Sequence, residues 1–342
     1  MPSRAPDPGL GISLPGAVRR AVEWRRALAV LVLGAALLLL LVAPLHISLY
    51  WQRVLSMTFM FATLAQAINL IAGFTGYPAF GNVVFFGLGA YSAAIVMVRG
   101  GSFALGLAAA VLVSLATVLL VGAPLLRLRG HYFAIATVGL NEMVKALASN
   151  LAPLTGGGMG LSVPLPPWGP TQSAQVFYYL LLTAMIGSIL VAAWFKVSRL
   201  GHACRAIRDD EVKAEAMGLR TTTIKTAAWA VSAMLTGLVG AIYAFWFSYV
   251  EPSAVFDMLI AIKFFVMFLL GGAATVLGPV IAAFFVEFVS TVLWSNLLHY
   301  HLGALGLGIV VIALFMPHGF VAFARDRSRI VAALLKPGAS GG

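Results

Sequence analysis

The sequence SRLGHACRAIRDDEVKAEAMG, at residues 198–218, is a block of charge inside an otherwise apolar chain. The whole chain has 22 basic and 11 acidic residues, and 11 of these charges lie between Lys196 and Lys225. Long apolar runs flank the block on both sides. Each charged side chain costs at least about 3 kcal/mol in the middle of a bilayer, so this block cannot lie in hydrocarbon. We therefore expect it to be an aqueous loop that membrane helices present to a partner.

The composition is that of an integral membrane protein. Of the 342 residues, 61% are hydrophobic and only 10% are charged, whereas soluble domains are about half apolar and a quarter charged. The net charge of +11 would suggest nucleic acid in a soluble protein. Here the basic residues gather beside apolar runs, as the positive-inside rule predicts for cytoplasmic loops. We expect a lipid bilayer and no nucleic acid as partner.

Apolar runs of membrane-spanning length recur along the chain, and we expect an all-α protein of about ten transmembrane helices. The predicted spans lie at about 27–47, 54–72, 83–99, 103–125, 132–149, 176–195, 223–247, 256–271, 275–296 and 303–319. With both termini in the cytoplasm, the basic loops 127–129 and 196–222 face inside and the uncharged connection 150–175 faces outside. The chain then divides into a cytoplasmic segment 1–26, a permease domain 27–320 and a cytoplasmic tail 321–342.

Four charged residues, Glu142, Lys145, Lys263 and Glu287, lie well inside predicted spans, away from the span ends. Because charges at membrane depth need partners or water, we expect Glu142 to pair with Lys145, three residues on, and Lys263 with Glu287 across two spans. Contact with a substrate is the alternative for these residues. The fifth span, with Glu142 and Lys145, and the eighth, with Lys263, could instead be broken or re-entrant. The one cysteine, Cys204, excludes an intrachain disulfide, and we expect it to be buried.

The usual catalytic motifs are missing from the sequence. No lysine follows a glycine, which excludes the phosphate-binding Walker A loop. No histidine precedes a glutamate. The G-x-S-x-G spacing occurs only as GASGG at residues 338–342, in the predicted tail and not at a turn between a strand and a helix, so it is not read as a nucleophile elbow. His299 and His301 are read as loop residues rather than as metal ligands. The chain is therefore not predicted to be an enzyme or to bind a cofactor.

Two glycine-rich stretches are candidates for gating or for a translocation path. Glycines between residues 73 and 81 should interrupt a helix, and those at 87 and 89 allow helices to pack closely. A broken helix at membrane depth lines a cavity or is covered by protein, and both alternatives stay open here. The second stretch, at 154–161, is either a flexible external loop or a docking or gating element.

The charged block itself reads as an amphipathic helix ended by Gly218. Ala203, Ile207, Ala214 and Met217 fall on one face, interrupted by Asp210. Its acidic and basic residues are balanced, which favours a protein groove over an anionic lipid surface.

These residues together resemble the LIV-type permeases, the membrane subunits of ABC importers for branched-chain amino acids. The resemblance covers roughly residues 54–320. The motifs that carry it are RAIRDDE at 205–211 with AEAMG at 214–218, the series from Asn69 to GLGAY at 87–91, LRGHYFAIAT at 128–137, LTGG at 154–157 with GL at 160–161, LGG at 270–272 with LGP at 277–279, and MPHG at 316–319.

The resemblance implies an ABC importer permease fold in a bacterial inner membrane. It also implies two cytoplasmic ATPase subunits that use the ATP, a second permease subunit (a paralogue) and a solute-binding protein. The positions matching the ATPase-coupling loop are Arg205, Ile207, Arg208, Asp209, Asp210, Glu211, Glu215, Ala216 and Gly218. The positions matching a translocation path or gate are Asn69, Gly73, Gly76, Gly81, Asn82, Tyr91, Thr155, Gly156 and Gly157.

Three positions depart from the family pattern, namely Asn82, Met159 and Lys263, and they leave the cargo open. Related permeases import urea, short amides or aromatic acids, which are the alternatives to branched-chain amino acids. Two other classes of function also remain: a secondary transporter that needs no ATPase, for which Glu142 and Glu287 would be the ion-binding candidates, and a membrane anchor that scaffolds a soluble partner.

Overall fold

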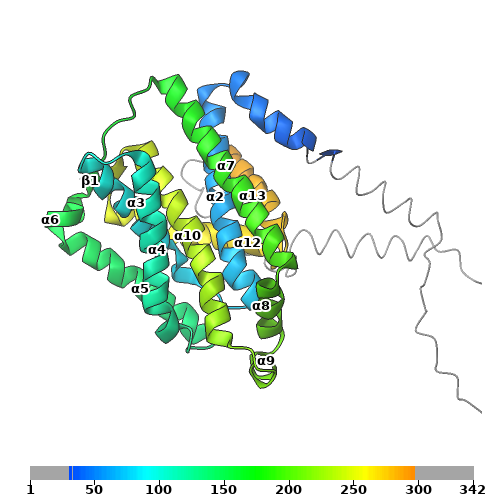
Figure 1. Cartoon of the computed structure of the whole chain (residues 1–342). Coiled ribbons are helices and arrows are strands. Elements are labelled where there is room, and N and C mark those ends of the chain that lie inside the picture. The colour runs from blue at the N-terminus through cyan, green and yellow to red at the C-terminus, as the bar shows by residue number, and fades with distance from the viewer. Residues whose placement is uncertain (1–30, 33, 297–342) are drawn as a thin grey trace, which may run out of the picture. The chain divides into compact units, whose positions relative to one another are not determined.

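The computed structural model describes residues 31–32 and 34–296, and these are almost entirely helical (Figure 1). The predicted segment 1–26, the tenth span 303–319, the tail 321–342 and both loop histidines lie outside the described residues. Residues before Leu49 form a unit of their own, with a helix up to residue 42 and a short 3-10 helix, η1 (Ala43–Leu45).

The second unit begins at Leu49 and contains the long helices. These are α2 (Leu49–Ile68), α3 (Val83–Val98), α4 (Phe103–Leu125), α5 (His131–Asn150), α7 (Pro170–Val197), α10 (Thr221–Phe247), α12 (Met258–Gly271) and α13 (Gly278–Asn296). The short elements are the π-helix η2 (Asn69–Gly73), η3 (Phe80–Asn82), α6 (Ala152–Thr155), η4 (Gly157–Met159), α8 (Arg199–Asp209), α9 (Glu211–Ala216), α11 (Pro252–Val255), and the strands β1 (Leu161–Ser162) and β2 (Tyr249–Val250).

Every predicted span from 54–72 to 275–296 coincides with a helix, which confirms an all-α membrane protein. Six helical stretches of the described residues are long and apolar enough to cross a bilayer: Leu49–Gly73, Phe80–Val98, Phe103–Leu125, Pro170–Val197, Thr221–Phe247 and Pro252–Gly271. Helix α5 has 20 residues but contains Glu142 and Lys145, and the apolar part of α13, Gly278–Thr291, is shorter. The total of ten spans stays a prediction.

The two ends of this helical unit carry different connections. Helix α7 runs down to α8 and α9, and α10 runs back from α9 to β2, where β2 pairs with β1 in an antiparallel register of Leu161 with Val250 (Figure 1). The charged block and the uncharged connection 150–175 therefore lie at opposite ends, as expected for loops on opposite sides of a membrane. We call these the α9 end and the β1–β2 end.

Small residues let the central helices approach closely. Helix α10 packs against α3 and α4, and α2 packs against α7, α12 and α13. A Cβ atom on Gly89 of α3 would lie only 2.1 Å from the carbonyl oxygen of Gly237 on α10. This is the tight glycine-mediated contact that the sequence predicts. In lipid the hydrophobic effect does not drive helices together, so close packing of this kind is what stabilises their association.

The prediction of one amphipathic helix across the charged block is wrong. The chain forms two helices, α8 and α9, separated by Asp210, whose backbone is extended (φ −162°, ψ 105°). Asp210 is an N-cap, because its Oδ1 accepts a hydrogen bond from the backbone N–H of Lys213 at 3.0 Å. The break resets the helical phase, so Ile207 and Ala214 are buried whereas Met217, expected on the same face, is 71% exposed.

The ionisable residues in the spans behave differently from each other. Lys263 and Glu287 form the predicted pair, with Nζ and Oε1 2.6 Å apart. Among the described ion pairs none joins Glu142 to Lys145, so that prediction is wrong; the Glu142 carboxylate instead accepts a hydrogen bond from Asn141 Nδ2 at 3.3 Å. Cys204 is fully buried as expected, and burial raises the pKa of its thiol to about 12.

Candidate functional site

Helix α2 does not end cleanly but breaks up, as the glycine spacing predicts. Its last turn widens into the π-helix η2, and the chain then runs without helix until η3 and α3 begin. Gly76, in this gap, has φ +77°, a left-handed conformation that glycine adopts without strain. We call residues 69–82 the helix break.

The helix break is fastened to the turn between α12 and α13. The side-chain amide of Asn69 accepts a hydrogen bond from the backbone N–H of Ala274 and donates one to the carbonyl of Thr275, both at 2.8 Å. A Cβ atom on Gly73 would lie 2.8 Å from the nitrogen of Ala274, so only glycine fits there without a shift. The Asn69 side chain therefore satisfies two backbone groups of the α12–α13 turn, and the break is packed against protein rather than left open.

Helices α8 and α9, here called the charged segment, contact the helix break directly. Arg208 of α8 donates a hydrogen bond from Nη1 to the carbonyl oxygen of Gly73 at 2.8 Å. The same arginine lies against Gly76, where an added Cβ atom would be 3.2 Å from its Cγ. A displacement of α8 therefore acts on the carboxyl-terminal end of α2 through a charge-assisted hydrogen bond.

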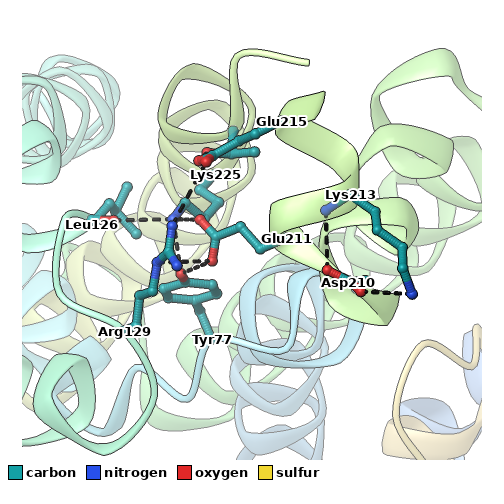
Figure 2. A network of polar contacts seen from close by, with 9 residues as sticks. Tyr77, Leu126, Arg129, Asp210, Glu211, Lys213, Glu215 and Lys225 are labelled. Atoms are coloured by element: carbon teal, nitrogen blue, oxygen red, sulfur yellow. Dashed lines mark hydrogen bonds and ion pairs between the residues drawn. The ribbon is translucent and has the colours of Figure 1, made fainter. Parts of the chain in front are cut away.

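A buried lysine forms a second attachment, shown in Figure 2. The ammonium of Lys225, on α10, donates to Glu211 Oε1 at 2.7 Å, to the hydroxyl of Tyr77 at 2.9 Å and to the carbonyl of Leu126 at 3.0 Å. The hydroxyl of Tyr77 donates in turn to the other carboxylate oxygen of Glu211. The Lys225 side chain is only 1% exposed. We call these four residues the Lys225 network; it joins α9, α10, the helix break and the end of α4.

Arg129 extends this network at the surface. Its guanidinium lies 3.8 Å from Glu211 and 3.7 Å from Glu215, and its own side chain is 58% exposed. Thr221 donates to Glu215 at 2.7 Å. Exposed ion pairs contribute little because water screens them, so the buried Lys225–Glu211 pair dominates the energetics.

The network changes the proton affinity of its members. Burial opposes ionisation of Glu211, but hydrogen bonds from Lys225 and Tyr77 and the positive charges of Lys225 and Arg129 outweigh it, so the pKa of Glu211 lies below its ordinary value. Burial, followed by the hydrogen bond to Glu211 and its negative charge, raises the pKa of Tyr77. Near neutral pH, Glu211 is therefore an anion and Tyr77 a neutral donor.

The residues predicted for ATPase coupling divide into two groups. Ile207 and Glu211 are directed into the protein, Arg205 bonds the carbonyl oxygens of Gly201 and Lys196, and Asp210 caps α9. The exposed members of the predicted set are Arg208, Asp209, Glu215, Ala216 and Gly218. Two exposed apolar side chains lie beside them: Val212, at 62%, which sequence reasoning missed, and Met217, at 71%, which it had placed on the apolar face with Ile207 and Ala214.

Of the residues predicted for a translocation path, Asn82 and Tyr91 are buried among other side chains. Asn82 accepts a hydrogen bond from the indole of Trp229 at 3.1 Å and donates to the hydroxyls of Ser232 and Thr236. Tyr91 is 4% exposed and stacks on Phe256. In this conformation both residues hold helices together rather than line an open path.

Gly81 and the second glycine-rich stretch also make specific contacts. A Cβ atom on Gly81 would lie 1.7 Å from the carbonyl oxygen of Thr137, so α5 crosses the helix break at this point. At the β1–β2 end, Thr155 donates to the carbonyl of Ala148 at 2.6 Å and accepts from the N–H of Gly157 at 3.2 Å. Gly156 and Gly157 follow with φ of +72° and +63°. The stretch is a turn built on hydrogen bonds.

A cavity of about 490 Å³ lies at the β1–β2 end and was not predicted. Arg53, Trp168, Phe177 and Trp246 are among its lining residues. Sequence reasoning also missed Tyr77, Arg129 and Lys225 as site residues. The one signal for Lys225 was its place four residues into the apolar helix Thr221–Phe247, where a lysine needs a partner.

Comparison with known proteins agrees with this architecture. Residues 50–316 match the family described as "Branched-chain amino acid transport system / permease component". The chain is 27% identical to the high-affinity branched-chain amino acid transport system permease protein LivM of Salmonella typhimurium and to its namesake in Escherichia coli, each over 93% of this chain and 81% of the relative.

No solved structure matches the chain. The family match covers most of its length, including the helix break and the charged segment. The protein is therefore a multi-pass membrane transport subunit and not an enzyme, and it belongs to the permease component family of branched-chain amino acid transport systems.

Proposed function

We propose that this chain is the membrane permease subunit of an ATP-driven ABC importer in a bacterial inner membrane, with both termini in the cytoplasm. Its partners would be two cytoplasmic ATPase subunits, a second permease subunit and a solute-binding protein on the other side of the membrane. The cargo would be branched-chain amino acids, which the names of both relatives specify for their own transport systems.

The observation that carries this proposal is the double attachment of the charged segment. Arg208 holds it to the helix break, and Glu211 holds it to Lys225 on α10. A partner that moves this segment would therefore move two membrane helices at once. Such a partner shifts the permease between conformations only if it binds one conformation more tightly than the other. A groove on an ATPase subunit that changes shape when ATP binds would meet that requirement.

The exposed side of the charged segment supports a protein partner. Val212 of α9 is 62% exposed and Met217, the residue that follows α9, is 71% exposed, and the charged residues Glu211, Lys213 and Glu215 lie between them or beside them in the chain. Exposed apolar side chains with charged neighbours are typical of a helix that docks into a groove. Since the sequence has no Walker A loop, ATP would be bound and hydrolysed by that partner.

The proposal is tested by placing charge on this apolar surface. The variant Val212→Glu with Met217→Glu should insert into the membrane normally but lose at least tenfold in co-purification of the ATPase subunits, with a parallel loss of uptake. Met159→Glu is the matched control, because Met159 is also highly exposed, at 83%, but lies in η4, near the β1–β2 end. It should keep the ATPases.

Two results would contradict the proposal. One is wild-type assembly and uptake by the double variant. The other is uptake by the purified chain alone in liposomes, driven by an ion gradient without ATPase partners, which would favour a secondary transporter.

A further inference from the structure

The ion pair between Lys263 and Glu287 lies deep in the membrane part of the chain. Lys263 is on α12 and Glu287 on α13, with Nζ and Oε1 2.6 Å apart. The ammonium also lies 4.2 Å from the ring centroid of Phe61. Phe61 is midway along the span Leu49–Gly73, so the pair sits near half the height of that helix, far from either aqueous end.

Stability alone does not explain such a pair. Charges at membrane depth are costly even when paired, and replacing a buried pair with apolar residues is often neutral or stabilising. Every other residue of α12 is apolar or glycine, so Lys263 is the one charged residue of this helix. An ionisable pair kept at this depth is therefore a candidate contact for a solute that crosses the membrane.

The pair lines a cavity, which we call the charged cavity. Its volume is about 290 Å³, close to the lower limit of about 300 Å³ for small-molecule sites. The cavity has an apolar side and a polar side. Val54, Met57 and Phe61 of α2 supply the apolar side, and Tyr50, Lys263, Glu287, Ser290 and Thr291 supply polar groups.

We propose that the charged cavity binds a zwitterionic amino acid with an aliphatic side chain during its passage. The ammonium of the solute would lie at the Glu287 carboxylate, its carboxylate at the Lys263 ammonium, and its side chain against Val54 and Met57. The proposal rests on the proposed function and names the class of cargo: neutral urea or amides would leave the Lys263–Glu287 pair closed on itself and gain no charge–charge contact, whereas a purely anionic acid that pairs with Lys263 would leave Glu287 without its partner.

The contact between the two charged side chains supports this assignment. Glu287 is 8% exposed and Lys263 26% exposed, so an unpaired charge at either position would be unfavourable. In the structure the two charges compensate each other. A zwitterion brings one charge of each sign, so both protein charges keep a partner when the solute enters, which a solute with a single charge cannot provide.

Photo-crosslinking tests the site without relying on transport. The full-length chain, in membranes with its partner subunits, would be illuminated with a diazirine analogue of leucine, and the adducts mapped by mass spectrometry. Adducts are expected on residues 54–61, reduced by excess leucine and not by urea. Glu287→Gln should lower this labelling at least tenfold, whereas Glu142→Gln, which changes a carboxylate on α5 outside the cavity, should not.

A charge-swapped variant separates binding from structure. Lys263→Glu with Glu287→Lys keeps an ion pair, so assembly should match the wild type, but the reversed charges turn the aliphatic side chain away from Val54 and Met57 and labelling there should stay low. The proposal is overturned if wild-type labelling shows no competition by leucine, if Glu287→Gln labels normally, or if the swap restores full labelling. Assembly with ATPases in the same membranes reports separately on the proposed function.

Discussion

Replacing Lys225 with methionine is the most direct test of the Lys225 network. Methionine keeps the length and the apolar stem of lysine, so it fills the same space on α10 and removes only the ammonium. The change takes a hydrogen-bond donor away from Glu211, Tyr77 and the carbonyl of Leu126 at once. It leaves Glu211 as a carboxylate that is only 14% exposed.

The expected loss of stability is about 3 kcal/mol. Removing one partner of a buried ion pair usually costs roughly 3–5 kcal/mol, because the other charge stays buried without compensation. The lower end applies here because Arg129, 3.8 Å from Glu211, supplies part of the missing charge from the surface. A loss of about 3 kcal/mol lowers the ratio of folded to unfolded protein by roughly a hundredfold.

A double-mutant cycle measures this coupling. The free energy of unfolding would be determined by denaturant titration in mixed micelles for the wild type, Lys225→Met, Glu211→Gln and the double variant. The double variant leaves no buried charge behind, so it should be more stable than the sum of the single losses predicts, by about 2 kcal/mol. Single losses that add to within about 0.5 kcal/mol would refute the reasoning, because they would mean that the two charges do not depend on each other.

Three further predictions concern titration, thiol reactivity and backbone strain. The folded state lowers the pKa of Glu211, so the ionised carboxylate stabilises the fold at neutral pH, and this contribution is lost as the pH falls below about 4. Glu211→Gln should therefore make the midpoint of unfolding depend less on pH on the acid side. An unchanged slope of midpoint against pH would contradict this. Cys204 is fully buried and its pKa is raised to about 12, so a maleimide should label it at pH 7.5 only after unfolding, and rapid labelling of the folded chain would show that α8 is open. Ala274 has φ +58°, which costs about 1–2 kcal/mol for a residue with a Cβ atom; Ala274→Gly should raise the thermal midpoint of unfolding in detergent, and a lower midpoint would mean that the strain is absent.

The helices and the helix break could be predicted from the sequence because their signals are local. Apolar runs of about 20 residues have few structural alternatives, and glycines spaced from 73 to 81 interrupt a helix wherever it packs. The Lys263–Glu287 pair followed from a general rule, since charges on neighbouring spans seek each other. The break at Asp210 had a local signal too: an aspartate just before a glutamate in a polar stretch favours an N-cap over a helix interior.

The Lys225 network could not be predicted, because its members come from distant parts of the chain. Tyr77 and Lys225 are 148 residues apart, and Tyr77 and Glu211 are 134 apart. Nothing in the spacing of these residues indicates that they meet. Their meeting depends on how α10 packs against α3 and α4, which is decided by small-residue contacts such as Gly89 with Gly237. The sequence indicated which residues need partners but did not identify those partners.

The two attachments of the charged segment explain why its break at Asp210 matters. Arg208 lies before the break and bonds the carbonyl of Gly73, whereas Glu211 lies after it and bonds Lys225 on α10. A single rigid helix would carry both contacts as one body. With an extended residue between them, α8 and α9 each have their own attachment: α8 bonds Gly73 through Arg208, and α9 bonds both Tyr77 and Lys225 through Glu211. A force on the exposed side of α9 would therefore reach α10 and the Tyr77 part of the helix break through Glu211, and the Gly73 part through Asp210 and α8. We therefore expect the angle between α8 and α9, rather than the position of either helix alone, to set how α2 and α10 move relative to each other.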